Sequence, residues 1–176
     1  MQNRSQALHD ELEAHWHTTE LPNLNDEEAR ACQLLQYPTQ EIIVKQGQPH
    51  SAIYFVAEGV LLEQQIDHQG TLTPKGLYSD GDWLMSLCHL SSTVSDSLIE
   101  SLTPCQLIEL PIDLVQTWRN TKSEKWPALL EVYCQQLEQR RRMRDFDSQL
   151  IYQSLLSRYP DLVNDFTVEQ CQQCVT

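Results

Sequence analysis

The fold of this chain is decided by the stretch EIIVKQGQPHSAIYFVAEGVLLEQQ, residues 41–65, which a hairpin follows and Gly81-Asp82-Trp83 closes. Within it, Ile53 to Val56 is wholly apolar, which is typical of a strand covered on both faces. Val60 to Ile66 alternates apolar with polar residues, and glycine and proline mark turns between the runs. Short strands with turns at this spacing indicate an antiparallel barrel or roll rather than a parallel sheet.

Helical periodicity precedes these strands. Gln6 to Trp16 is predicted to form a short amphipathic helix, and Asn25 or Asp26 can cap a second one. The apolar face of the second helix is predicted to contain Ala29, Cys32, Leu34 and Leu35.

Two more strands are predicted at residues 97–102 and 105–110, after which the period becomes helical, beginning at Ile112. A long helix is predicted to start with Pro127 at its first position and to run to about Phe146. A rival start, capped by Thr121, would place the proline inside the helix. A last helix is predicted from Ser148 to Tyr159.

Composition excludes several classes of protein. Twelve basic residues against 25 acidic ones give a net charge of −13, which repels phosphate backbones and anionic lipids. No run approaches the ~20 apolar residues of a membrane span, and the N-terminus has no apolar segment of a secretory signal, so a cytoplasmic protein is expected. No catalytic triad order, carboxylate pair or phosphate-binding loop argues for an enzyme.

The cysteines offer no chemistry by their spacing. Cys171 and Cys174 form a CxxC pair, but zinc needs four ligands and the sequence supplies no second pair at a suitable spacing. We expect these two to be small apolar residues of a helical segment, and the other four to be reduced thiols, three of them in apolar runs. Neither a metal nor a cofactor is expected.

At this point a family pattern is visible. Glu41 to Gly47, then Ile53 to Val56 with Gly59, then Gly81 to Leu84 resemble the effector domain of the catabolite-activator (Crp/Fnr) family. The resemblance implies an α+β fold, a cyclic-nucleotide-binding-type β-roll (a double-stranded β-helix or jelly-roll) flanked by helices. It also implies that the long helix is a C-terminal dimerisation helix.

The resemblance divides the chain into three parts. Residues 1–120 would hold the N-terminal helices and the roll, and residues 121–147 the dimerisation helix. Residues 148–176 would be a helical stub resembling the start of a helix-turn-helix domain. Because only residues 163–176 follow the resemblance, we expect no second, groove-reading helix and no DNA binding by this chain.

The family pocket holds the ribose hydroxyl and the cyclic phosphate with a Gly-Glu pair and an Arg-Ser-Ala turn. The Gly-Glu positions fall on Met85 and Ser86, and the Arg-Ser-Ala positions fall on Ser95, Asp96 and Ser97. Ser86, Ser95, Asp96 and Ser97 are therefore the candidate ligand-binding residues of a degenerate pocket. Without the arginine, and with a carboxylate at Asp96, we expect no binding of cAMP or cGMP in the family manner. The hydroxyl-rich run at residues 91–97 is expected to be a solvated connection.

The long helix carries both an apolar seam and a basic run. Leu130, Cys134 and Leu137 could bury a two-fold contact, and the resemblance favours a homodimer through this helix. Arg141 and Arg144 continue this stripe at the same spacing, and the run from Arg140 to Arg144 is expected to be a solvated face paired with Glu138, Asp145 and Asp147. These residues favour a non-catalytic regulatory protein that acts by dimerisation or through a protein partner. The alternative is a functional transcription regulator of the same family that responds to a different small effector.

Overall fold

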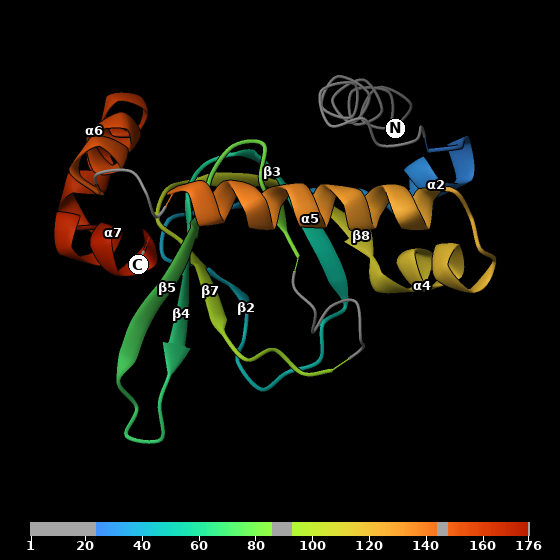
Figure 1. Ribbon diagram of the computed structural model, residues 1–176, viewed down its shortest axis with the longest axis horizontal. Helices are drawn as coiled ribbons and strands as arrows, with labels where there is room; N and C mark the ends of the chain where they lie inside the picture. Colours follow the sequence, from blue (N-terminus) through green and yellow to red (C-terminus); the bar gives the residue numbers. More distant parts are fainter. Residues whose placement is uncertain (1–23, 86–92, 144–147, 176) are drawn as a thin grey trace.

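The computed structural model describes residues 24–85, 93–143 and 148–175 (Figure 1). The helix predicted at residues 6–16 lies outside this part. The elements are α2 (Asp26–Ala31), β1 (Gln33–Tyr37), β2 (Ile42–Val44), β3 (Ala52–Glu58), β4 (Leu61–Ile66), β5 (Leu72–Tyr78), β6 (Trp83–Leu84), β7 (Leu98–Ser101), β8 (Cys105–Pro111), α4 (Ile112–Asn120), α5 (Lys125–Met143), α6 (Ser148–Arg158), the 3-10 turn η1 (Pro160–Asn164) and α7 (Val168–Val175).

Two four-stranded antiparallel sheets form the roll, with strand orders β1-β8-β3-β6 and β2-β7-β4-β5. The predicted antiparallel roll is therefore confirmed. In β3, Ile53 and Phe55 point into a cluster beneath α4 and α5, whereas Tyr54 and Val56 point into a second cluster between the sheets. This is the physical reason for the unbroken apolar run, because alternate side chains of one strand fill two different cores.

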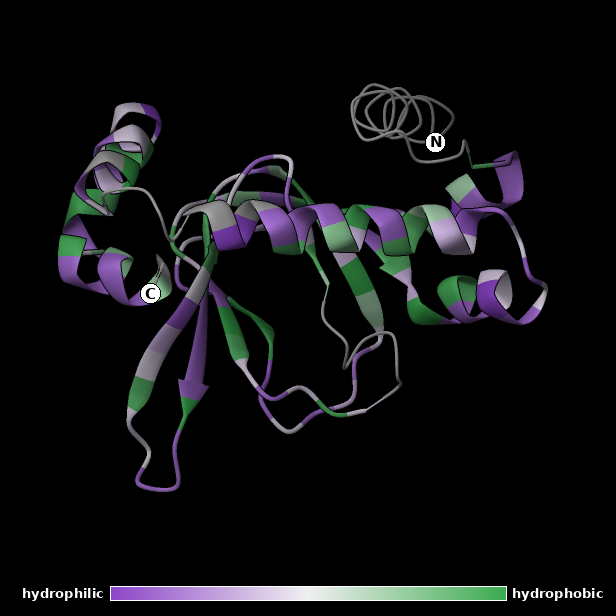
Figure 2. Ribbon diagram, viewed as in Figure 1, coloured by the Kyte–Doolittle hydropathy of each residue, from purple (hydrophilic) through white to green (hydrophobic). Residues whose placement is uncertain are grey.

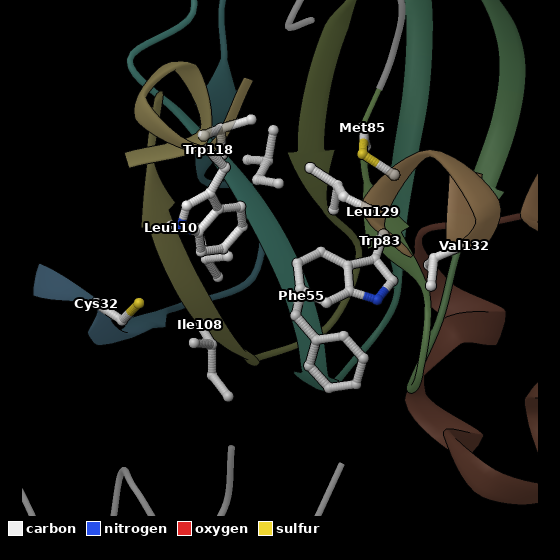
Figure 3. Close-up of a cluster of buried hydrophobic side chains, with 11 residues drawn as sticks. Cys32, Phe55, Trp83, Met85, Ile108, Leu110, Trp118, Leu129 and Val132 are labelled. Carbon is white, nitrogen blue, oxygen red and sulfur yellow. The ribbon is translucent and has the colours of Figure 1, made fainter. Parts of the chain in front are cut away.

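The first cluster joins the roll to α5 (Figure 3). The rings of Phe55 and Trp83 meet edge to face with their centroids 5.2 Å apart. Leu129 and Val132 of α5 are buried against the same cluster, with 0% and 8% of their surfaces exposed. Figure 2 shows polar and apolar residues alternating along α5, as expected for a helix with a buried side.

Gly59 forms the turn between β3 and β4. Its φ of +111° lies in a region that side chains rarely adopt, and an added Cβ would stand 2.5 Å from the Sγ of Cys105. Only glycine fits both requirements at this turn.

The second predicted helix is shorter than expected. Asn25 caps it as predicted, accepting bonds from the N–H groups of Glu27 and Glu28. The helix ends at Ala31, however, and residues 33–37 form β1, which pairs with β8. The expected helical face containing Leu34 and Leu35 is therefore wrong, because pairing with an available sheet edge outweighs a weak helical pattern.

The long helix begins at Lys125, two residues before the predicted start, which places Pro127 at its third position. The proline is tolerated there because the first four N–H groups of a helix have no partner within it. Ser123 stands before the helix and accepts a bond from the N–H of Lys125 through its Oγ, at 3.4 Å. The helix is described as far as Met143; residues 144–147 lie outside the description.

The helix predicted from Ser148 to Tyr159 is confirmed as α6, and Cys171 and Cys174 lie in α7 as expected. Together with η1, these helices pack against the sheet that contains β4 and β5, forming a third apolar cluster. No helix among the described residues is long and apolar enough to cross a membrane.

Candidate functional site at the seam between the roll and α5

Most of the predicted pocket positions within the described part of the chain are buried. Ser95 and Ser97 are buried, with 4% and 6% of their surfaces exposed, whereas Asp96 between them is exposed. Met85 is buried in the first cluster (Figure 3), and Ser86 lies outside the described residues. Of the candidate ligand-binding residues, the structure thus brings Ser95, Asp96 and Ser97 together in the turn before β7.

Hydrogen bonds fix this turn from within. The Oγ of Ser95 donates to the backbone oxygen of Ser97 at 2.6 Å. The backbone of Ser95 exchanges two bonds with the β2–β3 turn, at 2.8 Å to the oxygen of Gln48 and 2.7 Å from the N–H of Gly47. The expected solvated connection is therefore wrong at Ser95 and Ser97, because their hydroxyls satisfy groups inside the protein.

Glu63 of β4 is the centre of a polar cluster beside this turn. Its Oε1 accepts a 2.6 Å bond from the Oγ of Ser97, and its Oε2 accepts a 3.0 Å bond from the hydroxyl of Tyr78 in β5. Burial raises the pKa of Tyr78, which keeps the phenol a hydrogen-bond donor. One carboxylate therefore ties together three separate segments of the roll. We call Glu63, Tyr78, Ser97 and Arg140 the seam cluster.

Arg140 brings a positive charge to the seam cluster from α5. Its guanidinium lies over the ring of Tyr78, 4.0 Å from the centroid, and its Nη1 is 3.8 Å from the Oε2 of Glu63. Burial is the largest single effect on this group and lowers its pKa, but Tyr78, Glu63 and Asp82 together outweigh it and raise the pKa. Arg140 is thus a charged residue held on the roll.

The expectation of a solvated arginine face is accordingly wrong at Arg140, whose side chain is only 32% exposed. It is right at Arg141, which is exposed and lies 3.8 Å from Glu138. Arg144 and the aspartates that follow lie outside the described residues.

Gln136 joins α5 to the roll one turn before Arg140. Its amide nitrogen donates to the backbone oxygen of Trp83 at 2.6 Å, and its amide oxygen accepts from the N–H of Trp83 at 3.0 Å. The side chain is 8% exposed. A buried amide with both groups paired fixes position as well as contributing stability.

The contact between α5 and the roll could have been predicted from the spacing of residues along α5, but the run of arginines suggested a solvated surface instead. Leu129, Val132, Gln136 and Arg140 follow one another at spacings of three or four, so they share a face of α5. The first two are apolar and buried, and the last two continue the same stripe onto the polar part of the roll. A stripe that changes from apolar to polar along one helix indicates a helix that crosses from a core to a polar cluster.

A small cavity lies elsewhere, beside the β2–β3 turn. It has a volume of about 150 Å³ and is lined by residues that include Val44, Lys45, His50 and Tyr54. Sites for drug-sized ligands generally measure about 300–1,000 Å³, so this cavity suits at most a small group. It contains no member of the seam cluster.

No cluster of metal-binding residues occurs within the described part of the chain. Cys171 is buried, and burial raises its pKa. Burial, with smaller effects of Cys171 and Glu63, raises the pKa of Cys174 to about 12. Protonated, covered thiols are poor nucleophiles and poor metal ligands, which agrees with a packing role for this pair.

Comparison of the sequence with protein families and with curated proteins finds no match. Solved structures do match. A proposed cAMP-binding regulatory protein from Silicibacter pomeroyi is similar with a TM-score of 0.59 and 16% identity, over 79% of this chain and 62% of that one. The sensor domain of the transcriptional regulator DNR from Pseudomonas aeruginosa is similar with a TM-score of 0.56 and 11% identity, over 89% and 94%. The c-di-GMP-responsive global regulator CLP from Xanthomonas campestris is similar with a TM-score of 0.56 and 19% identity, over 72% and 66%.

These likenesses define the class of fold. The chain is a cyclic-nucleotide-binding-type β-roll of the kind found in Crp/Fnr-type regulators, and the predicted resemblance is confirmed at that level. At identities below 20% the likeness concerns the fold alone. The chain spans about three fifths of the length of the Silicibacter protein.

Proposed function

We propose that this chain is a non-catalytic regulatory module of the Crp/Fnr type. In this module, side chains of the roll and of α5 fill the space between the two. The seam cluster carries the proposal. Ser97 and Tyr78 donate to Glu63, and Arg140 of α5 lies over Tyr78 and near Glu63. In this arrangement the side chains of α5 and the roll contact one another directly.

Binding of a cyclic nucleotide in the family manner does not fit these residues. The position of the family arginine is Ser95, which is buried and donates its hydroxyl to Ser97. Asp96 adds an exposed carboxylate, and Met85 fills the place of the family glycine with a buried side chain. Each lost charge-assisted bond to the phosphate forfeits about 1.5–3 kcal/mol, so we expect no cAMP or cGMP affinity in the micromolar range.

The proposed action is through association. Leu130, Cys134 and Leu137 form a stripe of α5 beside the one that holds Gln136 and Arg140, and Leu137 is 47% exposed. A second copy of this chain that packs on that side would form the dimer expected for the long helix. The other binding partner that this side would suit is a different protein. In this proposal residues 1–120 are the sensor unit, residues 121–147 the dimer helix and residues 148–176 the stub. With a net charge of −13, DNA binding by this chain is not part of the proposal.

One observation favours a second candidate, a regulator that responds to a different small effector. The Nη2 atom of Arg140 is buried and has no hydrogen-bond partner among the residues that the structure describes. A buried donor without an acceptor is uncommon and calls for an explanation. An effector with an acceptor oxygen would satisfy it.

The test is calorimetric titration with cAMP and cGMP, followed by a thermal-shift panel of nucleotides and metabolites. A ligand present at 100 times its Kd stabilises by about 2.7 kcal/mol, which raises the Tm of a chain of this size by roughly 5–10 °C. We expect no heat of binding for either cyclic nucleotide and no stabilisation across the panel. Micromolar binding of cAMP would overturn the proposal.

A matched pair of variants separates the two candidates. If a compound stabilises the chain, Arg140→Met should abolish the shift and Arg141→Met should leave it unchanged, which would favour the effector-responsive regulator. Arg141 is the appropriate control because it is a neighbouring arginine on α5 with its side chain 80% exposed.

A further inference from the structure

The residues after α5 form one structural unit on the outside of the roll. α6, η1 and α7 pack on one another and on the sheet containing β4 and β5 (Figure 1). Leu162, Phe166 and Cys171 of this unit are buried, with exposures of 1% or less. Four apolar side chains of α6 are half-buried among those that the structure describes; they are Ile151, Tyr152, Leu155 and Leu156. The unit is thus held by few fully buried side chains.

Polar contacts centred on Asp80 hold the unit on the roll, and an exposed bond from the Nε2 of Gln40 to the Oδ1 of Asp165, at 3.2 Å, adds to them. The Oδ1 of Asp80 accepts a 2.6 Å bond from the hydroxyl of Tyr159 and a 2.7 Å bond from the N–H of Gly59. The same N–H lies 3.0 Å from the Tyr159 oxygen, and Arg158 forms an ion pair with Asp80. Burial, followed by the bond to Asp80, raises the pKa of Tyr159 to about 12, so its hydroxyl remains a donor.

The apolar cluster that joins the unit to the roll is separate from the two other clusters of the roll. The roll side of the third cluster consists of Val60, Leu62 and Leu102, with Leu77 packed against it. None of these residues belongs to the two clusters that hold the sheets and α5 together. The strands beneath remain paired by backbone bonds, β4 with both β5 and β7. Loss of the unit would therefore uncover an apolar face without opening either core of the roll.

We propose that residues 148–175 are a latch, which opens as one unit from the face formed by Val60, Leu62 and Leu102 while the roll stays folded. The latch itself covers this face, and the hydrogen bond from Tyr159 to Asp80 holds it there. Segments with few buried apolar contacts are those that open sub-globally at low free energy. The latch would control access to a surface that an amphipathic helix fits. The inference rests on these contacts alone and is independent of the proposed closed seam.

Hydrogen–deuterium exchange of the whole chain, resolved by peptide, tests the latch. In the unaltered chain, slowly exchanging amides of residues 148–175 are expected to exchange at least tenfold faster than those of β3 and β8. Tyr159→Phe, which removes only the hydroxyl, should speed exchange of residues 148–175 by a further factor of about ten, the effect of one buried hydrogen bond. Peptides from β3 and β8 should not change.

The control is Ser157→Ala, because Ser157 is exposed on the same helix and bonds only within it, to the oxygen of Gln153. It should leave exchange unchanged. If Tyr159→Phe speeds exchange of the roll and residues 148–175 equally, the two parts open together and the latch does not exist. If Tyr159→Phe changes nothing, the contact at Asp80 does not fasten the latch, which also overturns the proposal.

Discussion

At the scale of the residue, Gly59 is constrained in three ways at once. It combines a positive φ, a close approach to Cys105, and an N–H that donates toward both Asp80 and Tyr159. Sequence alone identified it as a turn glycine. Its contact with Tyr159, a hundred residues later, could not be predicted, because nothing local marks Tyr159 as its partner.

Gly59→Ala should destabilise the chain by about 3 kcal/mol, since it adds strain at positive φ to a clash with Cys105 and the backbone of Pro104. The measurement is the urea midpoint at constant slope. Gly70→Ala is the control, because Gly70 has a φ of +83° but no atom within 4 Å of its added Cβ. It should cost only about 1 kcal/mol. Equal losses at both positions would show that packing around Gly59 is unimportant.

Glu63 is the second decisive residue, because it accepts two hydrogen bonds and lies close to the half-buried Arg140. Glu63→Gln should lower the free energy of unfolding by about 1–3 kcal/mol, since it removes the carboxylate that is paired with the half-buried Arg140. Glu138→Gln removes the carboxylate paired with Arg141, which is exposed, and should cost about 0–0.5 kcal/mol. Chemical denaturation of both variants checks this, and a loss at Glu63 no larger than that at Glu138 would contradict it.

At the scale of the element, α5 has two faces with different roles. Leu129, Val132 and Gln136 face the roll, and Leu130 and Leu137 lie on the neighbouring stripe. The sequence predicts that this outer stripe is a dimer contact, which stays a prediction. The inner one was not recognised, because Arg140 belongs to a run of arginines that is typical of a solvated surface. β1 was not predicted for a related reason. Its residues continue the pattern of the capped helix before them, and nothing local in the sequence indicates that they pair with the edge of β8.

Leu137→Lys tests the outer face. If a second copy packs there, a charge in the dimer contact should raise the dissociation constant of the dimer at least tenfold. Light scattering at several concentrations measures this. Leu72→Lys is the control, because Leu72 is similarly exposed at 50% but lies on the β4–β5 hairpin. An unchanged association for Leu137→Lys, or an equal loss in both variants, would remove this face as the dimer contact.

At the scale of the whole molecule, three apolar clusters account for the architecture. The order of strands and the turn glycines sufficed to predict the roll, because alternation and turns are local properties of sequence. The degenerate pocket stays a prediction, which rests on the residue types at positions 85, 86 and 95–97. The seam cluster was not predicted, because Arg140 comes from a segment far from Glu63 and Tyr78 in the sequence.

The bond between Gln136 and Trp83 has a consequence for the sheet as well as for the helix. β6 is the last strand of its sheet, and a terminal strand offers unpaired N–H and C=O groups to any other chain. The amide of Gln136 meets both groups of Trp83, much as the peptide unit of a neighbouring strand would. A single glutamine thus imitates a further strand at this residue and shields that part of the sheet edge from joining another sheet.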